Sequence, residues 1–154
     1  MVNMNDKSKV INLCGYPVSW VKNTITGDEW IKANGSTFIQ NAEIQAQIDN
    51  GNLYIKGIDD IGSHADIYID NPEFREELKF DDKVENRKQL IVDEDICKNV
   101  FESKALSTFK KNVEKTIITI PEKLKIMEVA RKVKLNEFDK VKFLEEYCKI
   151  KFAE

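Results

Sequence analysis

The first half of the chain carries short apolar-rich runs separated by glycine, proline and asparagine, a pattern typical of strands and turns. The runs predict strands over 10–13, 18–21, 29–33, 36–39, 53–56 and 65–70. Between the third and fourth runs, Asn34-Gly35 favours the positive φ values of a tight turn, so we predict a hairpin there. A second hairpin, with a longer loop, is predicted from the last two runs.

Two short helices are predicted within this strand-rich half. Asn41 is a preferred capping residue for a helix over 42–48, and Gly51 suits the left-handed residue that ends it. An Asn-Pro pair at 71–72 indicates the start of another helix over about 73–78, because proline has the φ of a first helical turn.

In the second half, apolar residues recur at helical spacing. The acidic run 93–95 suits the first turn of a helix whose apolar stripe is Ile96, Val100 and Phe101. Another helix is predicted from about Ser107. Its buried residues are expected to be Phe109 and Val113.

The last two predicted helices form a hairpin. Thr119 and Glu122 match a capping box, in which each side chain accepts from the backbone of the other residue. The residues that follow at helical spacing are Leu124, Met127, Ala130 and Val133. After a connection over 134–136, Asn136 is expected to cap the final helix. Its apolar face is expected to contain Val141, Leu144 and Cys148.

These elements predict an α+β fold. A small antiparallel sheet, sandwich-like or barrel-like and accompanied by short helices, comes first, and a helical part that ends in a helix hairpin follows. We place a β-rich lobe at 1–80, a linker at 81–89, where charged residues are dense and apolar ones few, and a helical lobe at 90–154.

Composition and charge narrow the class of protein. The chain is 154 residues long, 42% hydrophobic and 33% charged, which suits a folded domain and provides no apolar stretch long enough for a bilayer span. The net charge of -3 is unevenly distributed. Residues 1–80 carry 7 basic and 12 acidic side chains, whereas 98–134 carry 10 basic and 4 acidic ones. An acidic front and a basic middle could meet between copies, so self-association is a hypothesis.

The sequence offers little for catalysis or metal binding. Its three cysteines are odd in number and widely spaced, which predicts reduced, partly buried thiols as in a cytoplasmic protein. The single histidine, His64, has no evident nucleophile beside it. Asp59, Asp60 and Asp66 lack the spacing of a calcium loop. We therefore predict no catalytic residue, no metal and no cofactor, and a protein that is not an enzyme.

The basic stretch before the final helix is the candidate contact surface for a partner. Its residues are Lys123, Lys125, Arg131, Lys132 and Lys134. With the closing helix pair they permit an alternative interpretation, a nucleic-acid-binding or regulatory protein. The last helix argues against it, because acidic residues such as Glu145 and Glu146 suit a solvated face better than a recognition helix. The aromatic residues on the predicted strands are expected to pack in the core: Trp20, Trp30, Phe38, Tyr54 and Tyr68.

The chain resembles the small accessory structural proteins of tailed-bacteriophage particles. The resemblance rests on the strand-turn-strand segments 18–23 and 33–39, the short capped helix that follows, and the tail 126–136 leading into 140–147. Such proteins decorate a capsid or sit at its neck. The resemblance implies a non-enzymatic virion protein, assembled in the host cytoplasm, that docks in many copies on capsid, portal or neck proteins. It carries over no catalytic residue.

Overall fold

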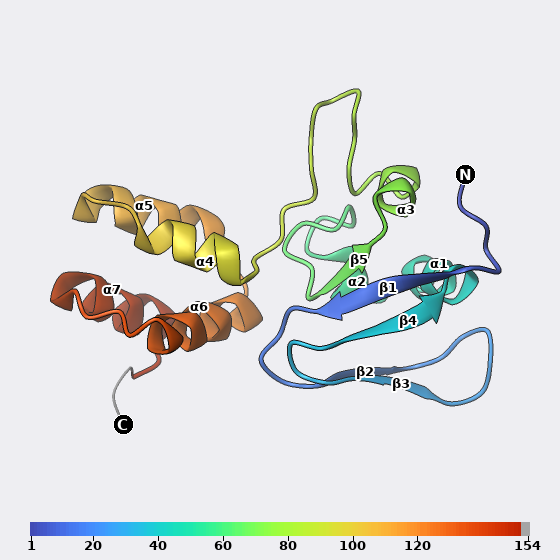
Figure 1. Cartoon of the computed structure of the whole chain (residues 1–154), viewed down its shortest axis with the longest axis horizontal. Helices are drawn as coiled ribbons and strands as arrows, with labels where there is room; N and C mark the ends of the chain where they lie inside the picture. Colours follow the sequence, from blue (N-terminus) through green and yellow to red (C-terminus); the bar gives the residue numbers. More distant parts are fainter. Residues whose placement is uncertain (152–154) are drawn as a thin grey trace. The chain divides into compact units, whose positions relative to one another are not determined.

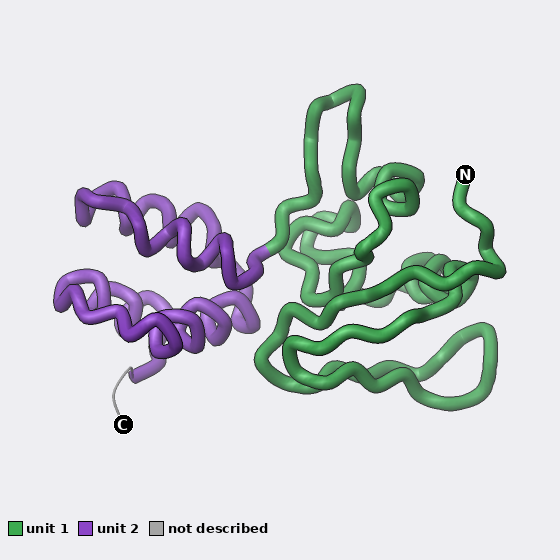
Figure 2. Tube along the Cα trace, in the orientation of Figure 1, with its two compact units in different colours: residues 1–91 green, residues 92–154 purple. Residues whose placement is uncertain are grey.

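The structure, a computed structural model, describes residues 1–151 and divides the chain into two compact units, 1–91 and 92–154 (Figure 2). Antiparallel sheets occupy the first unit and helices the second, with 41% helix and 17% strand overall. The predicted α+β class, sheets first and helices after, is confirmed. Residues 152–154, the end of the predicted helical lobe, lie outside the described residues.

The first unit is built on a three-stranded antiparallel sheet of order β4-β1-β5 (Figure 1). The strands are β1 (Lys7–Asn12), β4 (Ser36–Gln40) and β5 (Ile67–Asp70). The inner face of the sheet is apolar because alternate residues, including Val10, Ile39 and Ile69, point into the core. The outer face carries the residues between them.

A separate two-stranded sheet pairs β2 (Val18–Val21) with β3 (Asp28–Ile31). The hairpin predicted across Asn34-Gly35 is therefore wrong, since β3 pairs with β2 and β4 pairs with β1. Asn34 does take the positive φ of a turn, 55°, but this turn passes the chain from one sheet to the other. The amide of Asn34 donates to the carbonyl of Cys14 instead of closing a hairpin ladder.

The predicted strand over 53–56 is also wrong, because these residues form the short helix α2 (Leu53–Lys56). The side chain of Asn52 caps it by accepting a hydrogen bond from the amide of Tyr54, a local signal that competes with extended backbone. The second predicted hairpin is absent for the same reason, and β5 pairs with β1.

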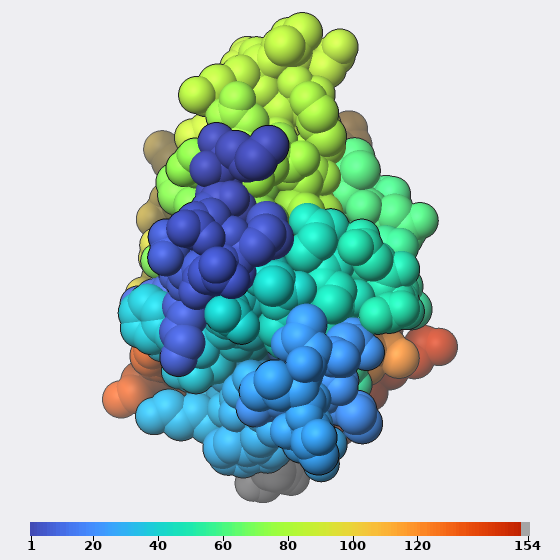
Figure 3. All heavy atoms as spheres, turned by 90° about the vertical axis from the view of Figure 1, so that its right-hand side faces the viewer, coloured from blue at the N-terminus to red at the C-terminus, as the bar shows by residue number. Residues whose placement is uncertain are grey.

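Two further helices complete the elements of the first unit. Helix α1 (Asn41–Asp49) begins one residue earlier than predicted, so Asn41 does not cap it. The side-chain amide of Asn41 instead donates to the carbonyl of Asn3, in the N-terminal segment that lies beside α1 and α3 (Figure 3). Helix α3 (Pro72–Glu77) is capped by Asn71 as predicted. The N-terminal ammonium group pairs with Glu73, which fixes the start of the chain on α3.

Residues 81–89, which the charge pattern assigns to a linker, lie within the first unit. Asp81 accepts hydrogen bonds from Arg75 and from the amide of Gln89, and the Gln89 side chain donates to the carbonyl of Gly62. The unit boundary falls at 91–92. A charged segment is thus held in place by hydrogen bonds that its composition does not reveal.

The second unit consists of α4 (Glu94–Phe101), α5 (Leu106–Thr116), α6 (Ile120–Lys132) and α7 (Phe138–Cys148). The predicted capping box of Thr119 and Glu122 is confirmed. Of the acidic run 93–95, Glu94 and Asp95 lie in the first turn of α4 as predicted, whereas Asp93 precedes the helix and caps it by accepting from the amide of Ile96. The core residues of the unit include Phe101, Phe109, Val113, Ile126, Met127 and Leu144. The apolar stripe of α6 is rotated from the predicted one, since Leu124 and Val133 are exposed.

Helix α5 is the one helix of this unit that starts from an apolar residue, Ala105, whose side chain cannot cap it. The backbone of Ala105 is already extended, with φ -80° and ψ 137°, and the first turn holds no acidic residue. We expect Ala105→Asp to raise the free energy of unfolding by about 1 kcal/mol, because the carboxylate can accept from a first-turn amide and complements the helix dipole. Urea denaturation followed by circular dichroism measures this, and Ala105→Leu, which cannot cap, should show no gain.

Candidate docking surface

Two large aromatic side chains on the strands are exposed instead of buried. Trp30 on β3 is 60% exposed and Phe38 on β4 is 63% exposed, so the expectation that both pack in the core is wrong. The reason is the alternation of the strands, in which Ile31 and Ile39 point inward and their neighbours must point outward. At these two positions the strands thus place an aliphatic residue in the core and an aromatic one on the surface.

Phe38 belongs to the outer face of the three-stranded sheet. Register places Phe38, Lys9 and Asp70 in one row across the strands, and Ser36, Ile11 and Tyr68 in the next. These six residues form what we call the open sheet face. Helices α1 and α2 pack on the opposite, buried face through Ile44 and Ile55, and Figure 1 shows them behind the sheet.

Trp30 belongs to the outer face of the β2-β3 hairpin, which consists of Ser19, Val21, Asp28 and Trp30. Val21 is exposed and lies diagonally across from Trp30, so an aliphatic and an aromatic side chain are neighbours there. On the other side of the hairpin, the ring of Trp20 stacks on Tyr54 with a centroid distance of 6.3 Å. Trp20 therefore holds the hairpin against α2 while Trp30 faces solvent.

The end of the hairpin that follows β1 is fixed by Asn12, which is fully buried. Its side-chain amide donates to the carbonyls of Tyr16, Ile31 and Lys32 at 2.9, 3.2 and 3.1 Å. Its side-chain oxygen accepts from the amide of Cys14 at 2.9 Å. One polar side chain of β1 thus holds the end of β3 and the segment that leads into β2.

The far end of the hairpin is fixed by Glu43 of α1, which is also buried. The carboxylate accepts from the amides of Asn23 and Thr24, from the Thr24 hydroxyl and from the side chain of Gln47. Burial raises the pKa of Glu43, but these hydrogen bonds outweigh it and bring the pKa down to about 2. Together with Asn12, Glu43 sets the orientation of the surface that carries Trp30.

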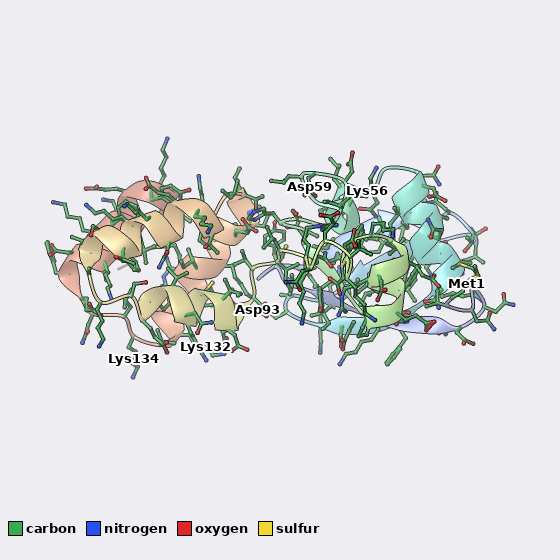
Figure 4. All side chains as sticks on the ribbon, turned by 90° about the horizontal axis from the view of Figure 1, so that it is seen from above. Met1, Lys56, Asp59, Asp93, Lys132 and Lys134 are labelled. Atoms are coloured by element: carbon green, nitrogen blue, oxygen red, sulfur yellow. The ribbon has the colours of Figure 1, made fainter. Side chains whose placement is uncertain are left out.

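The loop around His64 does not assemble a metal site. Among the described residues no group of three or more His, Cys, Asp or Glu side chains could hold a metal ion. Asp59 accepts from the amides of Ile61 and Ser63 and so shapes its own loop, and Asp60 pairs with Lys56 at 3.5 Å (Figure 4). Two of the three carboxylates considered as calcium ligands, Asp59 and Asp60, therefore have partners within the protein.

The three cysteines are free and buried. Burial raises the pKa of the Cys97 thiol to about 12 and that of the Cys148 thiol to about 11. Both therefore stay protonated at neutral pH, and a protonated thiol is a weak nucleophile.

The basic residues predicted to contact a partner do not share one surface. Lys125 is buried. Lys132 pairs with Glu94 of α4 at 2.6 Å, and Glu94 also pairs with Lys98. Hydrogen bonds from Lys132 and Lys98 lower the pKa of Glu94 to about 2. Two of the five predicted contacts are thus engaged within the second unit.

The other three lie elsewhere on α6 and just after it. The ammonium of Lys123 lies 4.9 Å from the ring centroid of Tyr147, and Arg131 donates to the carbonyl of Lys151. Lys134 is exposed at the turn after α6 (Figure 4). The predicted contact surface rested on the number of basic residues along this stretch of the sequence. That number does not show on which side of the helix each basic residue lies, or which acidic residue pairs with it.

A cavity of about 500 Å³ lies between α3 and the loop that follows it. It is lined by Pro72, Glu73, Arg75, Glu76, Asp81, Asp82, Lys83, Asn86, Arg87 and Lys88. Its charges satisfy one another, as in the pairs of Arg75 with Asp81 and of Lys83 with Glu76. Because opposite charges are balanced around it, the cavity favours no particular charged ligand.

By its fold the chain is an α+β protein in two units, and the exposed faces of the first unit are its clearest candidate site. No known protein family, curated protein or solved structure matches the chain. None of the helices in 1–151 is both long enough and apolar enough to span a bilayer.

Proposed function

We propose that this protein is a non-catalytic docking component, which binds another protein through the open sheet face and the outer hairpin face. The observation that carries the proposal is the exposure of Trp30 and Phe38 on rigid strands. Large aromatic side chains are enriched among the residues that dominate binding energy in protein interfaces. Placing them on strands keeps the entropic cost of binding low, because the backbone is already ordered.

The setting that we propose is a virus particle, with capsid, portal or neck proteins as partners and many copies bound per particle. The support is the resemblance to accessory proteins of tailed bacteriophages. The side chains of the faces suit such a role, because apolar anchors are bordered by single charges, Lys9 and Asp70 on the sheet and Asp28 on the hairpin. A polar border of this kind is typical of the rim of an interface.

The test compares two double variants in virus particles produced by the organism that carries the gene. Trp30→Ser with Phe38→Ser removes both aromatic anchors, whereas Val84→Ser with Ile58→Ser removes two apolar residues outside the faces that are together at least as exposed. Each lost anchor should cost about 2 kcal/mol, so we expect binding about a thousandfold weaker for the first variant. The control variant should bind like the wild type.

The measurement is the number of chains per purified particle, determined by quantitative mass spectrometry after a density gradient. Both variants should keep the wild-type free energy of unfolding within about 0.5 kcal/mol, because surface substitutions have small effects. The proposal fails if the wild-type chain is missing from the particles, or if the first variant is retained as well as the control.

A further inference from the structure

The outward side of α5 carries a row of lysines. Lys111 and Lys115, four residues apart, lie on one side of the helix, and Lys104 lies in the connection just before it. Phe109 and Val113, on the opposite side, are fully buried. The three exposed lysines, which we call the α5 lysine face, therefore point away from the core of the second unit.

None of these three lysines has an ion-pair partner among the described residues, in contrast to Lys98, Lys132 and Lys140. Lys98 and Lys132 share Glu94, and Lys140 is buried against Glu137. On α5 the single acidic residue is Glu114, which is bonded to none of the three lysines. Helix α5 carries Lys110, Lys111 and Lys115 against the single acidic residue Glu114 and therefore keeps a net positive charge.

We propose that the α5 lysine face binds the phosphate backbone of double-stranded nucleic acid without reading its sequence. Helix α5 is 11 residues long and so spans about 16 Å at 1.5 Å per residue, and a duplex presents about ten phosphates over that length. Lysine suits phosphate as a point charge. Base recognition would need free arginine, asparagine or glutamine side chains, but α5 has no arginine or glutamine, and its Asn112 donates to Ser103.

An acidic protein surface, including the first unit of another copy, is the competing partner. Residues 1–91 carry 15 acidic and 10 basic side chains, so their negative charge is diluted by positive charge. Phosphates along a duplex are dense and of one sign, which matches three unpaired lysines better. The site is independent of the docking proposed for the first unit, and it is also distinct from the α6–α7 helix pair.

The experiment measures fluorescence anisotropy of a labelled duplex of about 20 base pairs, in two unrelated sequences, with the full chain at about 50 and 200 mM salt. Three neutralised phosphates predict a slope of log affinity against log salt near about -2.7, or an affinity loss of about 40-fold between these conditions. The two sequences should bind with affinities equal within about twofold, since phosphate contacts carry no sequence information.

The test variant is Lys104→Gln with Lys111→Gln and Lys115→Gln, and the control is Lys7→Gln with Lys32→Gln and Lys79→Gln, three exposed lysines of the first unit. Both remove three charges. We expect the test variant to bind at least about 30-fold more weakly at the lower salt and to lose the salt dependence, while the control keeps both. Circular dichroism confirms that each variant is folded.

Three results would overturn the inference. The wild-type chain could fail to bind the duplex at the lower salt, or the test variant could bind as well as the control. The third result is a competition in which poly-glutamate displaces the labelled duplex as effectively as unlabelled duplex does at equal charge concentration. That result would assign the α5 lysine face to an acidic protein partner.

Discussion

Replacing Glu43 by glutamine lowers the free energy of unfolding of the first unit by about 2–3 kcal/mol. Glutamine has nearly the same shape but a neutral side chain, and only one of its two terminal atoms can accept. Some of the donors that converge on the carboxylate then lose their acceptor in a buried or partly buried position. These donors are the amides of Asn23 and Thr24, the Thr24 hydroxyl and the Gln47 side chain. Buried unsatisfied donors are costly, which is why the effect exceeds that of an ordinary hydrogen bond.

Tryptophan fluorescence in a urea titration measures this effect on the first unit, because the two tryptophans of the chain, Trp20 and Trp30, both lie there. Glu85→Gln is the matched control, an identical change at an exposed carboxylate of the same unit, and it should shift stability by less than about 0.5 kcal/mol. Equal stabilities of the two variants would show that the Glu43 hydrogen bonds contribute nothing beyond solvation.

The same carboxylate makes stability depend on acid pH. Its pKa falls from 4.5 in the unfolded chain to about 2 in the folded one, so the unfolded state binds the proton more readily. The pKa difference contributes about 3 kcal/mol to the free energy of unfolding. This contribution is fully present above pH 5 and is lost as the pH falls toward 2. The Glu43→Gln variant lacks this contribution. Its stability should converge with that of the wild type between about pH 5 and 2.

The helical second unit could be predicted well because its signals are local. The Thr119–Glu122 capping box joins residues three apart, and the structure contains it, whereas the predicted cap Asn136 is wrong, because α7 begins after Glu137 without a side-chain cap. Strand pairing in the first unit is not local. A turn with positive φ does form at Asn34, but not at Gly35 as a hairpin turn would need, and nothing near it in the sequence tells that β4 pairs with β1 and not with β3. A turn sequence is compatible with several pairings of the strands around it, and contacts between residues far apart in the sequence determine which pairing forms.

The candidate surfaces could be predicted less well, for two physical reasons. Alternation at Trp30-Ile31 tells that one of the two residues faces solvent, but not which one, because both types suit a core. The signal that was available is that an aromatic and an aliphatic residue next to each other in a half-buried strand cannot both be inside. For the lysines, the deciding fact is tertiary, since Lys132 finds Glu94, which lies 38 residues earlier in the chain.

Replacing Asn12 by aspartate destabilises the first unit by at least about 4 kcal/mol and is the most damaging single change that we expect in this chain. Three carbonyl oxygens, those of Tyr16, Ile31 and Lys32, receive hydrogen bonds from the side-chain amide. A carboxylate in its place presents a buried negative charge to three acceptors. The same repulsion separates the hairpin from β1, so Trp30 loses its fixed position on the surface.

Asn86→Asp is the control, because Asn86 is exposed in the same unit and aspartate tolerates its positive φ of 51°. Urea titration followed by tryptophan fluorescence should give a wild-type midpoint for this variant and a much lower one for Asn12→Asp. The deficit of Asn12→Asp should shrink as the pH falls from about 7 toward 4, because burial raises the pKa of the new carboxyl group and protonation restores a donor. A deficit that does not change with pH would mean that the lost amide donors, and not the buried charge, determine the effect.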